Sequence, residues 1–250
     1  MKYSNINIPN LSFCITCKNR FHQISQTLQK NLDDNRMFQH LIEFVLVDFG
    51  STDGLQDWVK NNFKADISTG YLKYYYTEGL PFWHASIAKN TAHLLANHKI
   101  IVNLDCDNYT GRNGGKFVIQ QFVKQGNGIV FHQLAEMLDG SYGRISLGKD
   151  NFLKVGGYDE TLEPMGYEDA DLLLRLTKSG IQYLLNSDER YNRAIFNPKE
   201  EGIHYSNSTL TWQEMDSINK NKSRRNACSG KLIANVDKKN WGIRADKYEF

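Results

Sequence analysis

The chain has 250 residues, of which 40% are hydrophobic and 12% aromatic, so it can bury a full core as one α/β domain or two small ones. Its formal net charge of +2 argues against general binding to nucleic acid, and no apolar stretch approaches the length of a membrane span. The first residues lead into no signal-type apolar segment, so we expect a cytoplasmic protein, with the inner face of the membrane as an alternative location.

Strand and helix patterns alternate over the first 110 residues. Short apolar runs predict strands at 11–16, 44–47, 72–76 and 100–104. Amphipathic spacing predicts helices at 22–32 and 86–96, and a further helix from the turn at 52–54 through Trp58. This alternation predicts a mainly parallel sheet covered on both faces, in which ligands bind beyond the carboxyl ends of the strands.

The pattern changes after residue 110. We expect a helix at 116–123, strands at 128–131 and 144–147, a turn at 156–159, and a helix at 168–179 that Gly180 ends. Beyond Gly202 we expect short helices and loops, with a basic cluster at Lys220, Lys222, Arg224 and Arg225. This cluster could meet the diphosphate of a ligand, an anionic acceptor or a membrane surface, or it could be a solvated face.

Two carboxylates, in Asp105-Cys106-Asp107, follow a predicted buried strand. Residues i and i+2 of a strand face the same way, so both carboxylates can point into one site. At about 6 Å and an effective dielectric constant near 20, their repulsion is roughly 3 kcal/mol. A hard divalent cation removes that repulsion and can then hold a diphosphate. The alternative is a polar strand end at which Asp107 and Asn108 begin a turn.

Three acids, Glu168, Asp169 and Asp171, occupy the first turn of the predicted helix at 168–179. Asp169 shares a face with the leucines at i+3, i+4 and i+7, whereas Asp171 can pair with Arg175 at i+4. Asp169 is therefore the acid directed to the interior, and we favour it over Glu168 as a general base that takes a proton from a hydroxyl. The alternative is that all three acids only complement the helix dipole.

The cysteines and histidines have simpler interpretations. Cys14 and Cys17 have the spacing of a redox or zinc pair, but they lie within a strand pattern and no second pair completes a zinc site, so we expect reduced structural thiols. His204 is a lone histidine and by default a structural residue.

Several segments match, in order, the motifs of one enzyme family. They are Ser12 to Arg20, Val47 to Asp53, Ala88 to Asn90, Asp105 to Asp107, Gly156 to Glu160, and Gly166 to Asp169. The chain therefore resembles the inverting, nucleotide-sugar-dependent glycosyltransferases of the GT-A fold. It is similar to the family 2 enzymes and to the galactosyltransferase-like C-terminal module.

The resemblance implies an α/β fold of the GT-A type, with a Rossmann-like, mainly parallel central sheet flanked by helices and a smaller mixed region on the acceptor side. It implies one domain, with a nucleotide-binding half (1–110), an acceptor and catalytic half (111–205), and C-terminal helices and loops (206–250). The implied reaction moves a hexose or N-acetylhexosamine from a UDP-sugar to a hydroxyl of a saccharide or glycolipid acceptor, with Mn²⁺ or Mg²⁺. Bacterial surface-polysaccharide synthesis is the implied setting, with peripheral membrane association as an option and with no nucleic-acid or protein partner.

The resemblance also implies a role for individual residues. The nucleotide would be bound by Thr16, Cys17, Lys18, Arg20, Asp48, Lys89 and Asp105, of which the first three would line the uracil pocket. The cation would be held by Asp107, with His204 completing its site and Asp105 touching the cation or the ribose. Catalysis would depend on Asp169 as the base, with Glu168 as the second candidate.

The chain departs from the family pattern at three positions. Phe49 replaces the second Asp of the family's "VDDGSTD" segment, which affects the expected contact of Asp48 with the base. Lys89 replaces Arg and so keeps the charge but loses bidentate geometry. Tyr167 stands where the galactosyltransferases have Gly, so the donor sugar can differ.

Other interpretations of the same residues stay open. The Asp-x-Asp pair would also serve a metal-dependent phosphohydrolase or nucleotidyltransferase, and the fold could belong to a non-catalytic domain that binds UDP-sugars. Trp83 and His84 could border the sugar sites, or they could be ordinary core or turn residues.

Overall fold

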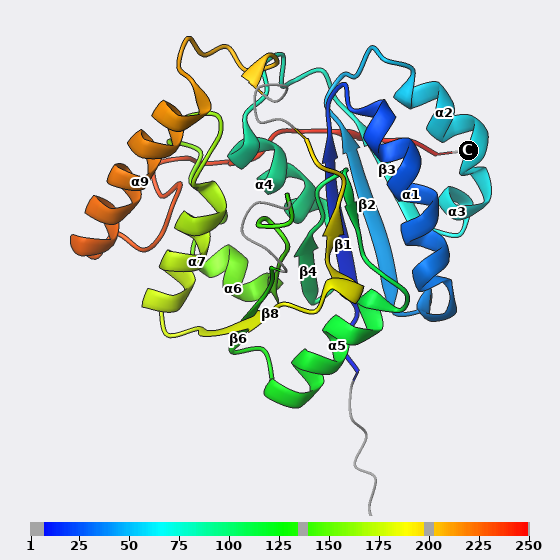
Figure 1. The fold of residues 1–250 in the computed structure, drawn as a ribbon, viewed down its shortest axis with the longest axis horizontal. Helices are drawn as coiled ribbons and strands as arrows, with labels where there is room; N and C mark the ends of the chain where they lie inside the picture. The colour runs from blue at the N-terminus through cyan, green and yellow to red at the C-terminus, as the bar shows by residue number, and fades with distance from the viewer. Residues whose placement is uncertain (1–7, 135–139, 198–202, 250) are drawn as a thin grey trace, which may run out of the picture.

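An eight-stranded sheet runs through the middle of the computed structural model, which describes residues 8–134, 140–197 and 203–249 (Figure 1). In sheet order the strands are β10 (Asp246–Lys247), β3 (Leu72–Tyr76), β2 (Ile42–Asp48), β1 (Leu11–Cys17), β4 (Ile100–Asn103), β7 (Ile145–Gly148), β6 (Ile129–Gln133) and β8 (Gln182–Asn186). All of them run in one direction except β7 and β10. The predicted mainly parallel sheet is therefore confirmed. A separate two-stranded ribbon joins β5 (Asn108–Tyr109) to β9 (Arg193–Ala194).

Helices cover both faces of the large sheet. One face packs against α1 (Phe21–Asn35), α2 (Leu55–Asn62), α3 (Lys64–Ser68) and α5 (Gly114–Gln125). The other face packs against α4 (Ala85–Leu95), α6 (Lys149–Lys154) and α7 (Glu168–Lys178). Short 3₁₀ turns occur at Arg36–Phe38 and Glu189–Tyr191. No helix in the described part of the chain is both long and apolar enough to span a membrane.

Strand β1 shows how the sequence produces these layers. Leu11, Phe13 and Ile15 pack into the core beneath α1 and α5, whereas Cys14 packs into the core beneath α4. Successive side chains of a strand point to opposite faces, so a strand buried on both faces needs a continuous apolar run. Phe13 also stacks on Phe44 of the neighbouring β2, with ring centroids 4.9 Å apart.

The last helix, α9 (Trp212–Cys228), is the outermost element on one side of the molecule (Figure 1). It begins with a capping box, in which Thr211 and Glu214 each accept a backbone N–H of the other residue. Its buried side chains, Met215, Asn219 and Ser223, recur every four residues, and the helix packs against α7. With 17 residues it is longer than the short helices expected beyond Gly202, and that expectation was wrong for this element.

After α9 the chain crosses the molecule as a C-terminal segment (residues 230–249) that ends beside α2 and α3 (Figure 1). The segment adds β10 to the sheet edge at β3. It also passes so close to Gly156 and Gly157 that side chains there would collide with it. A Cβ on Gly156 would lie 2.0 Å from the carbonyl oxygen of Ala234, and one on Gly157 would lie 2.5 Å from the Trp241 ring. Both glycines also have left-handed backbones, with φ of +72° and +66°, which disfavour any other residue.

Candidate active site

The carboxyl ends of β1, β2 and β4 meet at one edge of the sheet, which we call the carboxyl edge. Cys17 at the end of β1 is in register with Asp48 at the end of β2, and Cys14 is in register with Asn103 at the end of β4. Asp105 therefore follows β4 at about the level where β1 ends. The polar clusters that the sequence places after these three strands lie together at this edge.

The segments that follow β1 and β2 are joined by hydrogen bonds. The backbone N–H of Asn19 donates to Ser51 Oγ (2.9 Å), and the N–H of Thr52 donates to Asn19 Oδ1 (2.7 Å). The N–H of Phe21, the first residue of α1, donates to Asp53 Oδ2 (2.8 Å). Asn19 has a left-handed backbone (φ 52°), which asparagine adopts more readily than most residues. The two loops thus form one connected wall of the carboxyl edge.

Lys18 and Asp48 lie inside this wall. Lys18 Nζ donates to the carbonyl oxygens of Phe49 (2.6 Å) and Leu80 (3.2 Å), and burial lowers its pKa although Asp48 opposes the shift. Asp48 is fully buried, and its carboxylate accepts from the Ser51 N–H and the Tyr74 hydroxyl, both at 2.8 Å. Burial raises the pKa of Asp48, and these hydrogen bonds oppose the rise. A contact between Asp48 and a uridine stays a prediction.

A buried ion-pair cluster joins α4 to the start of α7. Lys89 Nζ lies 2.7 and 2.8 Å from the two carboxylate oxygens of Asp169 and 3.0 Å from Glu168 Oε1. Lys89 is 5% exposed and Asp169 is 9% exposed. Asp169 is thus buried, as its spacing in the sequence predicts. Asp171 is buried even more deeply, at 1% exposed, and accepts from Arg175 Nε at 2.7 Å. The predicted pairing with Arg175 is present, but the expectation that Asp169 alone is directed to the interior was wrong, because the Arg175 guanidinium allows the Asp171 carboxylate to be buried as well.

In this cluster Asp169 is the group that titrates near neutral pH. Burial raises the pKa of Asp169 to about 7; the Lys89 ammonium opposes that rise, and the carboxylates of Glu168 and Asp105 add to it. Burial alone would lower the pKa of Lys89, but the carboxylates of Asp169, Glu168 and Asp105 outweigh burial and hold that pKa well above its usual value. Lys89 is therefore charged at neutral pH, and Asp169 titrates where a general base is most useful.

Gly143 lies between the carboxylates of Asp105 and Asp169. A Cβ on this glycine would be 2.8 Å from Asp105 Oδ2 and 3.1 Å from both Asp169 Oδ2 and Asn103 Nδ2. Asn103 Nδ2 donates to the Gly143 carbonyl (2.9 Å) and to Asp105 Oδ1 (3.0 Å). The missing side chain thus lets β4, the Gly143 backbone and α7 approach one another closely. The sequence carries no local signal for Gly143 or Asn103, because their neighbours in the site come from distant segments.

Asp107 is held by two asparagine side chains. Asn108 Nδ2 donates to Asp107 Oδ1 (2.5 Å), and Asn197 Nδ2 donates to Asp107 Oδ2. Burial raises the pKa of Asp107 to about 6, the negative charge of Asp105 adds to the rise, and the two asparagines oppose it. Both causes, burial and a neighbouring carboxylate, disfavour the charged form of an acid. Asn197 was not foreseen, since it lies ninety positions along the chain from Asp107.

His204 is not grouped with these aspartates. Its side chain is exposed and packs edge-on against Tyr205, with ring centroids 5.2 Å apart. The carbonyl of Tyr205 accepts the backbone N–H of Trp83 (2.7 Å), which fixes this turn beside the start of α4. Among the described residues, no three His, Cys, Asp or Glu side chains are arranged to hold a metal ion. The structure thus does not assemble the ligand set of Asp105, Asp107 and His204.

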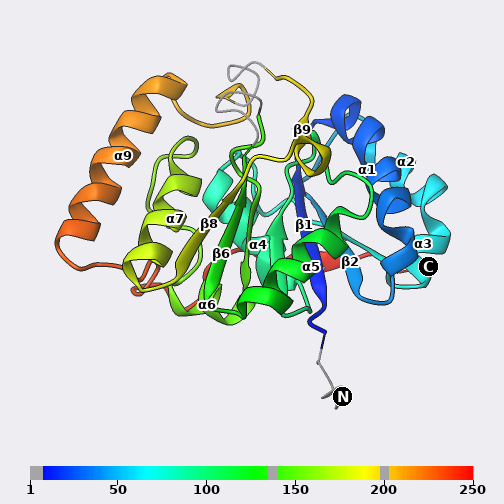
Figure 2. The same cartoon turned by 60° about the horizontal axis from the view of Figure 1, so that its bottom comes forward.

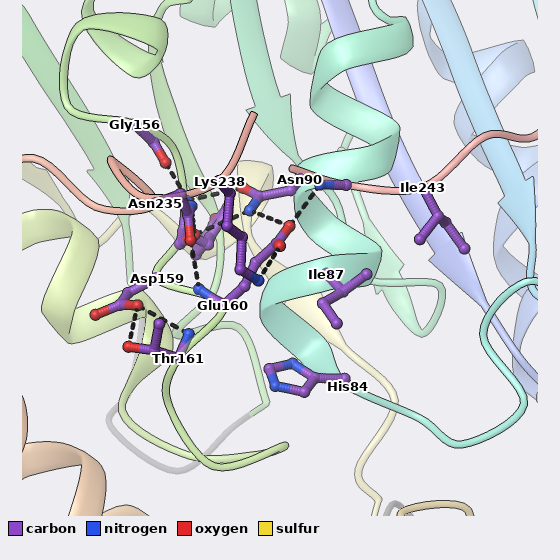
Figure 3. Close-up of polar contacts among 12 residues, drawn as sticks. His84, Ile87, Asn90, Gly156, Asp159, Glu160, Thr161, Asn235, Lys238 and Ile243 are labelled. Atoms are coloured by element: carbon purple, nitrogen blue, oxygen red, sulfur yellow. Dashed lines mark hydrogen bonds and ion pairs between the residues drawn. The ribbon is translucent and has the colours of Figure 1, made fainter. Parts of the chain in front are cut away.

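The Glu160 carboxylate connects α4 to the C-terminal segment (Figure 3). It accepts from Asn90 Nδ2 (2.9 Å), Lys238 Nζ (2.7 Å) and the Gly242 N–H (2.5 Å). The Asn235 side chain lies beside it and accepts the Glu160 N–H at 3.1 Å. Asn90 is the residue next to Lys89 on α4, so this network fixes the helix that carries the buried ammonium.

Trp83 and His84 have partners within the protein. The Trp83 ring packs edge-on against Phe49, with centroids 5.9 Å apart. His84 Nε2 lies 3.2 Å from the Leu162 carbonyl and therefore donates to it, and burial lowers the pKa of this histidine. These contacts match the interpretation of both residues as packing residues.

The remaining candidate residues lie elsewhere. All four cysteines are free, and Cys14 and Cys17 are buried. In the basic cluster on α9, Lys222 donates to the Thr161 carbonyl, whereas Arg224 and Arg225 are exposed.

Comparisons with known proteins identify the family. A sequence profile described as glycosyl transferase family 2 matches residues 12–141, and one described as the N-terminal domain of galactosyltransferase matches residues 139–199. A search of curated proteins finds no match.

Solved structures share the fold at low sequence identity. S. aureus TarS in complex with UDP has a TM-score of 0.62 and 15% identity, covering 88% of this chain and 72% of that one. The mannosyltransferase PcManGT from Pyrobaculum calidifontis, in complex with GDP-Man and Mn²⁺, has a TM-score of 0.64 and 16% identity, covering 88% of this chain and 64% of that one. These likenesses show the GT-A fold. The family 2 profile spans more than half of the sequence, and the protein is therefore a glycosyltransferase of family 2.

Proposed function

We propose that this glycosyltransferase moves a hexose or N-acetylhexosamine from a UDP-sugar to a hydroxyl of a saccharide acceptor, with inversion and with a divalent cation. The observation that supports this most is the buried pair of Asp169 and Lys89 beside Asp105 at the carboxyl edge. The TarS structures in complex with UDP and with UDP-GlcNAc support a UDP-sugar donor, and the PcManGT complex with GDP-Man and Mn²⁺ supports a cation.

In the proposed reaction Asp169 accepts the proton of the acceptor hydroxyl. The acceptor oxygen forms a bond to the anomeric carbon as the bond from that carbon to the diphosphate breaks, and UDP leaves with the electron pair. One displacement of this kind inverts the anomeric configuration. Lys89 holds both carboxylate oxygens of Asp169 and so fixes its position and its basicity.

Asp107 and Asp105 are the residues that would hold the cation. Asp105, Glu168 and Asp169 lie near the ammonium of Lys89, and Asp107 lies near Asp105, so these four carboxylates and one ammonium carry an excess of negative charge. Mn²⁺ and Mg²⁺ suit a site with one or two carboxylates, because phosphate oxygens and water complete their shell, and this assignment does not depend on His204. When bound, the cation would stabilise the charge on the leaving diphosphate.

The cellular setting is also part of the proposal. The family resemblance favours bacterial surface-polysaccharide synthesis. The exposed Arg224 and Arg225 are the basic groups that would face an anionic acceptor or the inner face of a membrane.

A thermal-shift screen of nucleotide sugars, with and without Mn²⁺, tests the proposal first. A donor at 100 times its Kd stabilises the fold by about 2.7 kcal/mol, which shifts Tm by roughly 5 to 10 °C. We expect that shift with one UDP-sugar, its loss in EDTA, and acceptor-dependent release of UDP from the same donor. Release of phosphate without an acceptor would instead indicate a phosphohydrolase. Tight UDP binding without turnover on any acceptor would indicate a non-catalytic domain.

A further inference from the structure

His132 on β6 is a buried histidine that holds two tyrosines. It is 1% exposed, its Nε2 lies 2.7 Å from the carbonyl oxygen of Tyr142, and its Nδ1 lies 2.8 Å from the Tyr183 hydroxyl. A carbonyl only accepts, so Nε2 carries the hydrogen and Nδ1 accepts from Tyr183. Burial lowers the pKa of His132, so the ring stays neutral and keeps this tautomer at neutral pH.

The rings of Tyr142, His132 and Tyr183 form an aromatic row, which begins beside the buried ion-pair cluster of Lys89 and Asp169. Tyr142 directly precedes Gly143, whose Cβ position is 3.1 Å from Asp169 Oδ2. The ring centroid of His132 lies 5.0 Å from that of Tyr142 and 5.8 Å from that of Tyr183. β6 and β8 lie side by side next to α7, which carries Asp169 (Figure 2). The row therefore leads from Asp169 outward to the β8 edge of the sheet.

The outer end of the row is open to solvent. Tyr183 is 41% exposed and Leu185 is 56% exposed, and as residues i and i+2 of β8 they share one face. Leu184, on the opposite face, packs against the main core. Tyr142, at the inner end, is half-buried. The row thus contains two tyrosine rings that solvent can reach, and the buried His132 ring lies between them.

Polar groups surround the inner ring. Burial raises the pKa of Tyr142 to about 12, with further contributions from Asp169, Tyr183, Tyr167 and Asp216, so its hydroxyl stays protonated and can donate a hydrogen bond. Tyr167 reaches this neighbourhood with a left-handed backbone (φ 65°), which is uncommon for a bulky residue. An aromatic face beside carboxylates and hydroxyls suits a ligand that has both C–H faces and hydroxyl groups.

We propose that the aromatic row binds an oligosaccharide acceptor of at least two sugar units, with Tyr142 under the sugar that reacts at Asp169 and with Tyr183 and Leu185 under the next one. This inference rests on the proposed function, because it assigns the acceptor side of the same site. A monosaccharide would reach only the inner ring. The enzyme would therefore extend a saccharide chain in preference to modifying a single sugar.

The test compares mono-, di- and trisaccharides of β-linked glucose and of β-linked N-acetylglucosamine, by saturation-transfer NMR with UDP and Mn²⁺ and by transfer kinetics. We expect the disaccharides to bind roughly tenfold more tightly than the monosaccharides, and Tyr183→Ala to remove that preference. Tyr183→Phe, which keeps the ring, should retain most of it. Tyr248→Ala, at a half-buried tyrosine that follows β10 at the other edge of the sheet, is the matched control. Hydrolysis of the donor in the absence of acceptor should be unchanged in all three variants.

Several outcomes would overturn the proposal. These are equal binding of mono- and disaccharides, no binding of any oligosaccharide in the two series, or an unchanged disaccharide preference in Tyr183→Ala. A dimer that Tyr183→Ala converts to a monomer in sedimentation would assign the β8 edge to a second copy of the chain instead. Failure of the proposed function would give a different result, namely a wild-type protein that binds no UDP-sugar. Binding of the oligosaccharides, measured by NMR, would still decide whether the aromatic row is a saccharide site.

Discussion

Replacing Lys89 by Met removes the ammonium of the buried cluster while keeping a side chain of similar length. In the structure this ammonium lies 2.7 and 2.8 Å from the two oxygens of Asp169 and 3.0 Å from Glu168. At about 3 Å and an effective dielectric constant near 20, one such attraction is worth about 5 kcal/mol. At 1.36 kcal/mol per unit, its loss raises the pKa of Asp169 by roughly 4 units.

The consequence appears in the pH dependence of transfer. The base must be ionised, so activity is lost on the acidic side of the pKa of Asp169, which burial raises to about 7 in the wild type. In Lys89→Met this acidic limb should move to about pH 11, and at pH 7.5 the ionised fraction should fall by roughly 1,000-fold or more.

The assay measures kcat against pH, from about 5.5 to about 11.5, at saturating donor and acceptor, so that it covers the expected limbs near 7 and near 11. Lys73→Met is the matched control, because Lys73 forms a similar lysine–carboxylate pair with Glu43 in the sheet, away from the carboxyl edge. Its acidic limb should stay at the wild-type position. If Lys89→Met kept a wild-type limb and a wild-type kcat, the reasoning about the buried ion pair would be refuted.

Three further substitutions test separate parts of the site. Gly143→Ala inserts a methyl group 2.8 Å from Asp105 and 3.1 Å from Asp169, so kcat should fall by roughly 100-fold while circular dichroism stays native; unchanged kcat would contradict this. Gly156→Ala places a methyl group 2.0 Å from a carbonyl of the C-terminal segment, so urea unfolding should show a loss of about 3 kcal/mol and limited proteolysis should cleave that segment first. Asp107→Asn should abolish Mn²⁺-dependent transfer. In the wild type, calorimetry should find Mn²⁺ binding roughly tenfold weaker at pH 5 than at pH 7, because a proton competes for a carboxylate with a pKa of about 6.

The strands buried on both faces could be predicted well from the sequence. The continuous apolar runs at 11–16 and 44–47 are typical of strands that are buried on both faces, and both form central strands of the sheet. Strand β8 was missed, because its residues lie half-exposed at the sheet edge and only the pairing with β6 defines it. Helix α9 was underestimated, because few of its residues are apolar and its buried face includes Asn219 and Ser223.

In the candidate site, too, local features could be predicted and contacts between distant segments could not. Helical spacing predicted the burial of Asp169 and the pairing of Asp171 with Arg175, because the side of a helix on which a residue lies is a local property. It did not predict that the Asp171–Arg175 pair would be buried too, because that depends on the segments that pack over the helix. Gly143 and His132 could not be found from the sequence, because each acts through contacts with segments far along the chain. His204 illustrates the reverse case. The family resemblance implied a ligand, which stays a prediction; the turn that carries this histidine is fixed beside Trp83 and leaves the imidazole exposed.

The central claim is that one buried carboxylate takes the proton of the acceptor. The most direct measurement compares Asp169→Asn with Glu168→Gln, by calorimetry for UDP binding and by initial rates for sugar transfer. We predict that Asp169→Asn binds UDP as the wild type does and loses transfer by roughly 10²- to 10⁴-fold, whereas Glu168→Gln keeps most of its activity. Wild-type transfer in Asp169→Asn, or a loss confined to Glu168→Gln, would contradict the account.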